Sequence, residues 1–273
     1  MKTLYISDLD GTLLNTNAEL TPYTAGVINQ LVSQGVLFSY ATARASSTAS
    51  AVTRNLSVEI PVIVYNGAFI LNSKTGTILS SILFSKNEIA YIKEALSGNI
   101  VTLLVYAYVN GKESVSWLVG KENEGISYYL ETRRGDKRLR PVDTVESLFM
   151  GDVFYVTCVG PQSEFAPINA VLRDDNRFSC IFQPELYSGV YWLEIMPRRA
   201  TKANAILKLK ELLCCNKIIS FGDSLNDISM FEISDECYAL ENAVPELKNV
   251  ATAIIESNND DGVAKWLAKN CLL

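Results

Sequence analysis

Short apolar runs alternate with helical periodicity at both ends of the chain. Strands are predicted over four such runs, residues 2–7, 36–44, 60–70 and 217–223. Thr21 and Pro22 predict a helix start, because threonine caps helices and proline suits the first helical position. Strands that alternate with helices predict an α/β fold, namely a doubly wound parallel sheet with a Rossmann-like core. The third run is interrupted at Asn66-Gly67 and leads into a predicted hairpin with its turn at 73–76.

The middle of the chain, residues 84–196, follows a different pattern. Helices and strands are predicted there at 86–97, 101–109, 114–119, 153–160, 163–173, 178–183 and 191–196. This order predicts an inserted α+β cap domain with an antiparallel sheet. The charge-dense stretch 131–143 is predicted as a connecting loop, and a basic edge that faces an anionic substrate is the alternative. Since the α/β pattern resumes afterwards, residues 1–83 and 197–273 are predicted to form one catalytic α/β core.

Composition narrows the classes of partner. The net charge of −6 gives no basic footprint for nucleic acid, so a small polar molecule is the expected ligand. No apolar run reaches the roughly 18–20 residues that cross a bilayer, which predicts no membrane partner. The first residues lack a secretory pattern, so a cytoplasmic location is expected. The sequence leaves the oligomeric state open.

Cysteine and histidine content restricts the chemistry further. The six cysteines form no CxxC pair and are expected to be free, reduced thiols. The chain contains no histidine, which excludes Ser-His-Asp and Cys-His catalysis and every histidine-dependent metal site. An enzyme with this composition must transfer protons through Asp, Glu, Lys, Tyr or water.

Two aspartates, Asp8 and Asp10, follow the first apolar run directly. Aspartate is a poor strand former and costly to bury alone. One carboxylate of such a pair can attack phosphorus, and the other can protonate the leaving oxygen and later deprotonate a water. Gly11 would let the backbone approach a phosphate closely. The alternative is ordinary turn chemistry, since Asp and Gly are favoured in turns.

A second acidic cluster lies in GDSLNDISM, residues 222–230. Asp223 ends a predicted strand and is the better candidate for a magnesium ligand, because this hard cation prefers oxygen ligands. Asp227 would ligate the ion or orient a bound water, and Asn226 would hydrogen-bond a phosphate oxygen or another ligand. Helix capping by Asp223 or Ser224 is the alternative.

Lys202 and Thr42 are candidate phosphate contacts. Lys202 stands at a predicted helix start, where the helix dipole disfavours a cation, so neutralising a phosphate would explain its place. Thr42 ends a predicted strand and would donate a hydroxyl hydrogen bond. The alternative for Lys202 is an exposed surface lysine, and the alternative for Thr42 is an ordinary strand residue, since threonine is common in strands.

Together these motifs resemble the haloacid dehalogenase-like hydrolase superfamily, most closely its Cof-type sugar-phosphatase branch. The resemblance is carried in order by DLDGTLL, YATAR, YNGAFI, ATKANAI, GDSLNDISM, LENAVPELK and NNDDGVAKWL. The insertion at 84–196 falls where that branch carries an α+β cap. Ala43 and Ala203 depart from the family pattern, because glycine is usual at both positions.

The resemblance implies a role for each candidate residue. Asp8 would be the nucleophile and Asp10 the general acid/base. Mg²⁺ would be held by Asp8, the carbonyl of Asp10 and Asp223, with support from Asp227. The phosphate would be bound by Thr42, Lys202, Asn226 and the backbone N–H groups of Leu9 and Asp10. Arg44 and Asn66 would line the side that faces the cap.

The resulting prediction is a Mg²⁺-dependent phosphomonoester hydrolase. Its substrate would be a small phosphorylated metabolite, with sugar phosphates as the expected class, and its intermediate an aspartyl-phosphate. A phosphomutase on the same scaffold and a non-catalytic binding module are the alternatives. The cap carries no readable motif; aromatic and basic residues at 106–140 and from Tyr187 to Trp192 are its candidates for substrate contact.

Overall fold

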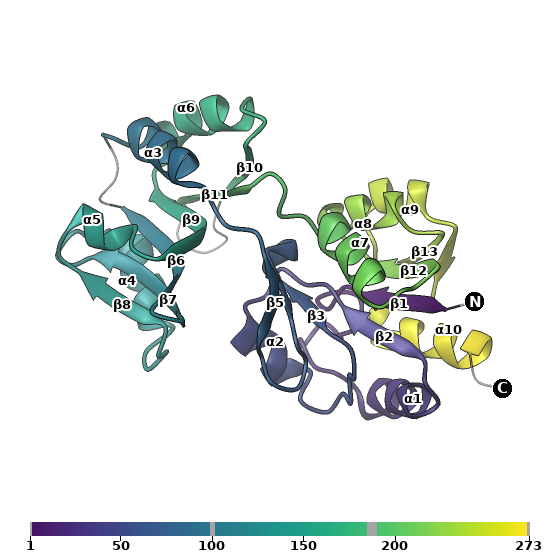
Figure 1. The fold of residues 1–273 in the computed structure, drawn as a ribbon. Coiled ribbons are helices and arrows are strands. Elements are labelled where there is room, and N and C mark those ends of the chain that lie inside the picture. The colour runs from purple at the N-terminus through teal and green to yellow at the C-terminus, as the bar shows by residue number, and fades with distance from the viewer. Residues whose placement is uncertain (1, 99–101, 185–189, 272–273) are drawn as a thin grey trace. The chain divides into compact units, whose positions relative to one another are not determined.

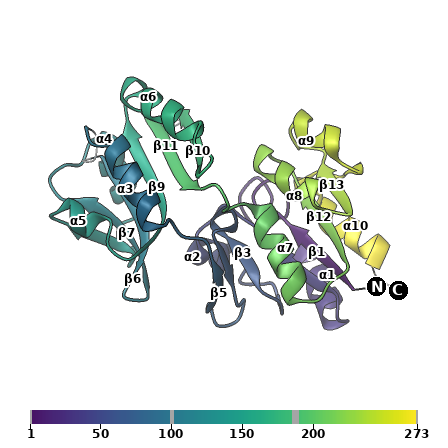
Figure 2. The same cartoon turned by 45° about the horizontal axis from the view of Figure 1, so that its top comes forward.

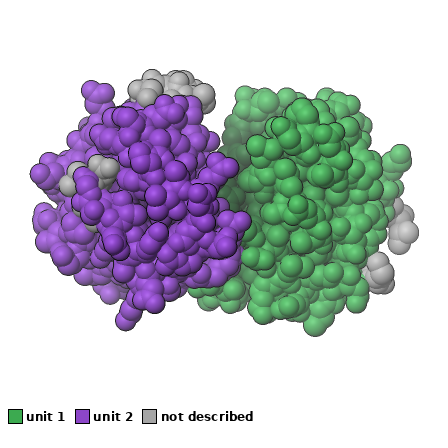
Figure 3. All heavy atoms as spheres, turned by 90° about the horizontal axis from the view of Figure 1, so that it is seen from above, with its two compact units in different colours: residues 1–81, 200–273 green, residues 82–199 purple. Residues whose placement is uncertain are grey.

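The computed structural model describes residues 2–98, 102–184 and 190–271. The chain divides into two compact units, which Figure 3 shows in green and purple. The core unit comprises Met1–Ser81 and Ala200–Leu273, and the inserted unit comprises Ile82–Arg199. That the first is catalytic and the second acts as a cap stays a prediction. Tyr187 and residue 101, which the sequence analysis included in predicted features, lie outside the described residues.

Five parallel strands form the sheet of the core unit, in the order β14-β13-β12-β1-β2. They are β1 (Thr3–Ser7), β2 (Leu37–Tyr40), β12 (Lys217–Gly222), β13 (Glu236–Leu240) and β14 (Ala253–Ile255). β1 lies between β2 and β12, and its Leu4 and Ile6 are fully buried. Apolar strands of this kind are typical of parallel sheets covered on both faces. The predicted α/β class is confirmed.

Helices cover both faces of this sheet (Figures 1 and 2). Helix α1 (Pro22–Ser33) packs with α10 (Gly262–Cys271). Helix α7 (Lys202–Leu212) packs with α8 (Ile228–Glu232), and α8 also contacts α9 (Pro245–Val250). A short α2 (Ser46–Val52) follows β2. The start of α1 is as predicted, because Thr21 accepts a hydrogen bond from the N–H of Thr24 and Pro22 opens the helix.

The predicted strand at 60–70 is interrupted where Asn66-Gly67 indicated a break, and the chain reverses there into a second strand. The structure has β3 (Val62–Val64), a 3-10 turn (Tyr65–Gly67) and β4 (Phe69–Leu71), which with β5 (Ile78–Ser81) make an antiparallel sheet. One parallel bridge, Ala41 to Ile63, continues the core sheet into β3. The reversal occurs because Tyr65 and Asn66 have φ of 51° and Gly67 has φ of 98°. The predicted β4–β5 hairpin is confirmed.

The inserted unit contains a six-stranded sheet in the order β10-β11-β9-β6-β7-β8. Its strands are β6 (Leu103–Val109), β7 (Lys112–Leu118), β8 (Leu139–Val142), β9 (Asp152–Gly160), β10 (Phe178–Pro184) and β11 (Tyr191–Pro197). Its helices are α3 (Lys86–Ala95), α4 (Glu124–Glu131), α5 (Val145–Leu148) and α6 (Gln162–Arg173). The sheet is mixed rather than antiparallel, because β8 pairs parallel with β7.

Strand β8 lies inside the stretch 131–143 that was predicted as a loop. Side chains hold it beside β7: Arg138 Nη1 donates to Glu113 Oε1 over 2.8 Å, and Arg140 Nη1 donates to Ser116 Oγ over 3.1 Å. Two of the arginines that suggested a solvated connection therefore bond to a neighbouring strand. The helices α4 and α5 were also missed; Asn123 and Thr144 cap them.

All six cysteines are free. Among the described residues, no helix is both long and apolar enough to cross a membrane.

Candidate active site

The turn after β1 brings Asp8 to the carboxyl edge of the core sheet. The Asp8 N–H donates to the carbonyl of Phe221 in β12 over 3.0 Å, which extends the strand pairing by one residue. The carbonyl of Leu9 then accepts from the N–H groups of Thr12, Leu13 and Leu14, so the chain coils tightly behind the aspartate. Leu9 itself is fully buried. The backbone thus fixes Asp8 where ligands of parallel sheets bind.

Lys202 joins two aspartates in a buried cluster. Its Nζ donates to Asp8 Oδ1 over 2.5 Å and to Asp227 Oδ1 over 2.7 Å. The side chains of Lys202 and Asp227 are 1% and 0% exposed. Lys202 is the first residue of α7, and Thr201 caps that helix. The two carboxylates offset the unfavourable helix dipole, and the alternative of a surface lysine is wrong.

Asp223 completes the cluster from the end of β12. Its Oδ1 accepts a hydrogen bond from Thr12 Oγ1 over 2.7 Å. Gly11 makes this approach possible: it has φ of 76°, and a Cβ there would lie 2.3 Å from Asp223 Oδ2. The glycine of the turn therefore admits an aspartate, where the sequence analysis expected a phosphate.

Asp227 is held mainly by the protein. Its Oδ2 accepts from the N–H groups of Asp223 and Ser224 over 3.0 and 3.1 Å, while its Oδ1 accepts from Lys202. Both oxygens are therefore in use. This carboxylate orders the loop after β12 and fixes the ammonium, whereas Asp8 and Asp223 each have one oxygen for which the described residues provide no hydrogen-bond donor.

The charges in the cluster suit a divalent cation. Carboxylate oxygens of Asp8, Asp223 and Asp227 all lie within 4.8 Å of one another. Three carboxylates less one ammonium leave an excess of two negative charges when every group is ionised. A hard divalent cation with oxygen ligands would neutralise this excess. The donor set of the cluster thus fits a divalent metal site.

Burial and charge shift the pKa values in the cluster. Burial raises the pKa of Asp8 to about 7, although the Lys202 ammonium opposes the shift. Burial also raises the pKa of Asp223 to about 6. For Lys202, burial lowers the pKa, but attraction to Asp8 and Asp227 outweighs it and the net shift is upward. The ammonium therefore keeps its proton, because one cation faces several carboxylates.

Asp10 lies apart from the cluster and pairs with Arg44. Arg44 Nε donates to Asp10 Oδ2 over 2.7 Å, and Nη2 donates to Oδ1 over 2.6 Å. The Asp10 side chain is 50% exposed. The pair is bidentate, the geometry that makes arginine–carboxylate contacts strong and directional. The predicted proton-transfer carboxylate is thus held by a residue that the sequence analysis assigned to the cap-facing side.

The remaining predicted residues lie at neighbouring strand ends. Thr42 is buried, and its Oγ1 accepts from the N–H of Arg44 over 3.1 Å, which leaves the hydroxyl proton to donate elsewhere. Asn226 Nδ2 donates to Asn66 Oδ1 over 3.3 Å. The predicted phosphate contact Asn226 and the predicted cap-facing Asn66 are therefore partners. The phosphate-binding role of the Leu9 N–H stays a prediction.

Three supporting residues were missed. Thr12 bonds Asp223 as described above. Asn242 Nδ2 donates to the carbonyl of Gly11 over 2.7 Å, and Asn258 Nδ2 donates to the carbonyl of Leu14 over 2.8 Å. These asparagines lie in LENAVPELK and NNDDGVAKWL. The two motifs were recognised in the sequence, but the contacts of their asparagines with the turn were not predicted. They anchor the turn that carries both aspartates.

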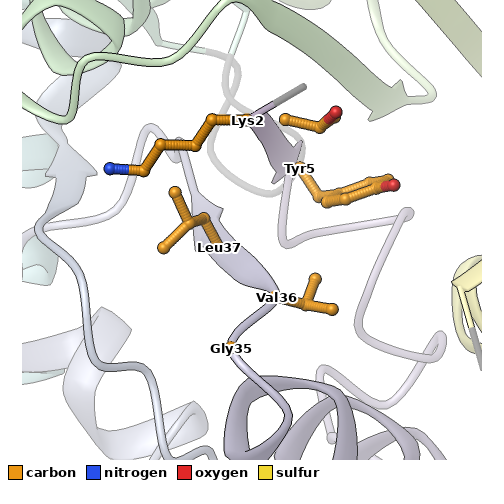
Figure 4. A pocket seen from close by; sticks show the side chains of 6 residues that line it. Lys2, Tyr5, Gly35, Val36 and Leu37 are labelled. Atoms are coloured by element: carbon orange, nitrogen blue, oxygen red, sulfur yellow. The ribbon is translucent and has the colours of Figure 1, made fainter.

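A separate cavity of about 500 Å³ opens beside the amino ends of β1 and β2 (Figure 4). Its lining includes Lys2, Tyr5, Val36 and Leu37. None of the described residues that line it carries a carboxylate. The chemistry-bearing groups all belong to the opposite edge of the sheet, which is therefore the candidate active site.

The whole chain is similar to known proteins. The model of the haloacid dehalogenase-like hydrolase family matches residues 5–267. The 5-amino-6-(5-phospho-D-ribitylamino)uracil phosphatase YwtE of Bacillus subtilis is 26% identical, over 98% of this chain and 97% of its own. The crystal structure of TM0651 from Thermotoga maritima has a TM-score of 0.78 at 24% identity, with 100% of both chains covered. A haloacid dehalogenase-like hydrolase from Bacteroides thetaiotaomicron also has a TM-score of 0.78, at 22% identity over 98% of this chain and 99% of that one.

The family match covers nearly the whole chain, and the solved structures share both the parallel core sheet and the inserted unit. The resemblance drawn from the sequence motifs is therefore confirmed: the chain belongs to the haloacid dehalogenase-like hydrolase family, in its Cof-type branch.

Proposed function

We propose that this phosphatase of the haloacid dehalogenase superfamily hydrolyses small phosphorylated metabolites through an aspartyl-phosphate on Asp8, with Mg²⁺ as its metal. The observation that carries the proposal is the buried contact of Lys202 with Asp8 and Asp227, next to Asp223. A carboxylate with one bonded and one free oxygen is oriented to attack in a single direction. The metal would be held by Asp8, Asp223 and the carbonyl of Asp10, with Asp227 in support.

The first step transfers the phosphoryl group. A carboxylate oxygen of Asp8 attacks phosphorus, the bond from phosphorus to the ester oxygen breaks, and Asp10 gives its proton to the departing alcohol. In the second step Asp10 takes a proton from water, whose oxygen attacks phosphorus and releases phosphate from Asp8. When bound, Mg²⁺ supplies positive charge that lets an anionic substrate approach an anionic nucleophile.

Phosphate binding falls to groups around the nucleophile. Lys202 is fixed beside Asp8 and offers charge to a phosphoryl oxygen, and the Thr42 hydroxyl proton is available to donate. The amide of Asn226 and the N–H of Leu9 complete the proposed set. Preorganised donors of this kind need no reordering when the charge moves, which is the source of their catalytic effect.

Asp10 must exchange its partner to act. In this structure both of its oxygens accept hydrogen bonds from Arg44. Proton transfer to a leaving group requires Asp10 to turn away from the guanidinium. Arg44 would then face the substrate, as its predicted place on the cap-facing side requires, and Asn66 would lie beside it.

The proposed substrate class comes from a relative of the chain. YwtE, by its name, acts on a phosphorylated ribityl compound, and this chain is 26% identical to it. Sugar and sugar-alcohol phosphates are accordingly the proposed class. The inserted unit, in the predicted role of a cap, would choose among them.

The test is hydrolysis of p-nitrophenyl phosphate with Mg²⁺ by the wild type and by Asp8→Asn. We expect turnover to fall by about 10³-fold or more, because the amide is not a nucleophile, and EDTA to abolish wild-type turnover. The control is Asp174→Asn, an exposed aspartate of the inserted unit, which should leave turnover unchanged. Full activity of Asp8→Asn would refute the mechanism.

A panel of hexose, pentose and sugar-alcohol phosphates, ranked by kcat/KM, then tests the substrate class. Release of free phosphate supports a hydrolase. An isomerised product and a need for a bisphosphate activator would indicate a phosphomutase instead. Inertness of the wild type on the whole panel would indicate a binding module.

A further inference from the structure

The inserted unit contains a cavity of its own, of about 640 Å³. Helix α4 and the turn after it contribute Tyr128, Tyr129 and Arg133 to the lining, and β10 and β11 contribute Gln183, Trp192 and Glu194. The volume lies within the range of about 300–1,000 Å³ typical of small-molecule sites. Every lining residue belongs to one unit, so the cavity is complete without the core.

The helix wall of the cavity is fixed to the sheet. Asn123 Nδ2 donates to the carbonyl of Val159 in β9 over 2.5 Å, while its Oδ1 caps α4 by accepting from the N–H of Ile126. Gly125 lies against the same strand, since a Cβ there would be 2.4 Å from Val159 Cγ1. Deep in the unit, the Tyr106 hydroxyl donates to the Tyr129 hydroxyl over 3.2 Å. The aromatic wall is therefore set before any ligand arrives.

Flat groups dominate the lining. The rings of Tyr129 and Trp192 have centroids 5.9 Å apart, at an interplanar angle of 47°. The guanidinium carbon of Arg133 lies 3.9 Å from the centre of the Tyr129 ring, and its Nη1 donates to Thr132 Oγ1 over 3.0 Å. Tyr128 is 51% exposed although its neighbour Tyr129 is buried. Such surfaces favour a planar ligand that can stack.

The polar groups of the cavity are few and of both kinds. Trp192 Nε1 is buried, and no acceptor for it exists among the described residues. Unsatisfied buried donors are uncommon and costly, so a ligand acceptor that reaches this N–H would be bound favourably. Glu194 offers carboxyl oxygens, and burial raises its pKa. The Gln183 amide provides both a donor and an acceptor.

We propose that this cavity binds a planar, uncharged heterocycle with carbonyl oxygens and N–H groups on its edge, as in a uracil ring. The aromatic side chains and the stacked guanidinium match the faces of such a ring. The indole N–H and the Gln183 amide match its carbonyl oxygens, and Glu194 matches its N–H groups. A phosphate or carboxylate would meet Glu194 and aromatic rings, which do not suit an anion, and the guanidinium of Arg133 already stacks on Tyr129. Binding of such a ring does not depend on the proposed hydrolysis, because the ring can be part of a substrate or of a separate effector.

Binding is tested on the full chain with uracil and 5,6-diaminouracil as probes, and ribitol as the non-planar control. The protein contains three tryptophans, so an amide spectrum of ¹⁵N-labelled protein shows three indole signals. Trp117 Nε1 already donates to Glu122 Oε1 over 2.9 Å, and Trp266 packs on Tyr238 in the core unit. We expect a uracil probe to shift the Trp192 signal, assigned with Trp192→Phe, in a saturable way. Ribitol should leave it unmoved.

Two neighbouring arginines provide a matched pair of variants. Arg133→Met removes the stacked guanidinium and should weaken uracil binding, measured by calorimetry, by about tenfold. Arg134→Met removes an exposed arginine paired with Glu131 and should change it by less than about twofold. Equal binding by the two variants, no binding of either uracil probe, or shifts confined to Trp117 and Trp266 would each overturn the proposal.

The source of the ring is separated by kinetics. A ring that belongs to the substrate predicts that Arg133→Met raises KM for uridine 5′-monophosphate and leaves KM for p-nitrophenyl phosphate unchanged. A ring that acts as an effector predicts that uracil alone changes turnover of p-nitrophenyl phosphate. Both results support the cavity as a heterocycle site. Calorimetry needs no turnover, so a failed binding test is distinguishable from a failure of the proposed hydrolysis.

Discussion

Replacing Lys202 by methionine tests the electrostatic account of the site. The ammonium lies 2.5 Å from Asp8 Oδ1 and 2.7 Å from Asp227 Oδ1, and its side chain is 1% exposed. Methionine fills a similar volume but leaves two buried carboxylates without their counter-charge. Breaking a buried pair in this way costs about 3–5 kcal/mol, most of it the cost of the carboxylates left behind.

The free energy of unfolding is measured by urea titration at pH 7.5 in EDTA. A Trp117→Phe/Trp192→Phe background leaves Trp266 as the fluorescent reporter of the core unit. With a urea dependence of about 2 kcal/mol/M, a loss of 3–5 kcal/mol lowers the midpoint by about 1.5–2.5 M. The control Lys208→Met removes a 52% exposed lysine of the same helix and should change stability by less than about 0.5 kcal/mol.

The pH dependence of the stability loss in Lys202→Met tests whether charge causes that loss. Without the ammonium, the pKa values of Asp8 and Asp223 rise further, so lowering the pH to 5 neutralises these two carboxylates and reduces the loss of stability in Lys202→Met. A loss that stays constant between pH 7.5 and pH 5 would mean that packing, not charge, explains it. A loss at pH 7.5 no larger than that of Lys208→Met would refute the electrostatic account altogether.

Three further predictions concern the pH, the metal and the backbone. The pKa values of Asp8 and Asp223, about 7 and about 6, lie above the unfolded value of 3.8, so the folded state binds more protons than the unfolded state. The free energy of unfolding in EDTA should therefore fall as the pH rises from about 4 through 7. A rise in this free energy, measured by urea titration, would contradict the assignment. Mg²⁺ should raise the Tm, and should raise it more at pH 8 than at pH 5.5 because the metal ligands must lose their protons. Asp223→Asn should remove most of this rise in Tm. An undiminished rise would exclude Asp223 as a ligand. Gly67→Ala should destabilise the core unit by at least about 2 kcal/mol more than Gly76→Ala. Both glycines have positive φ, but only at Gly67 would a Cβ lie 2.1 Å from the carbonyl oxygen of Thr201. Equal losses of stability in urea titrations would show that this contact does not matter.

Local patterns predicted the core well where one element decides the outcome. The apolar run of β1 and the Thr21-Pro22 helix start depend on neighbours in the chain, and both lie where they were predicted. Asn66-Gly67 indicated a break in the third run, but the reversal also depends on a positive φ at Tyr65, which this residue type does not signal. Strand β8 depends on pairing with β7, a partner distant along the chain.

The sequence by itself determined which chemical groups the site contains. With no histidine in the chain, and with acidic residues directly after β1 and β12, carboxylates were the expected source of the chemistry. Tertiary structure alone decided how those groups divide. It placed Asp8 and Asp227 on one buried ammonium and paired the half-exposed Asp10 with Arg44, because their separation across strands β1, β2 and β12 closes only when the sheet assembles. Contacts between residues some 200 positions apart are set by the packing of whole elements, which no local pattern encodes.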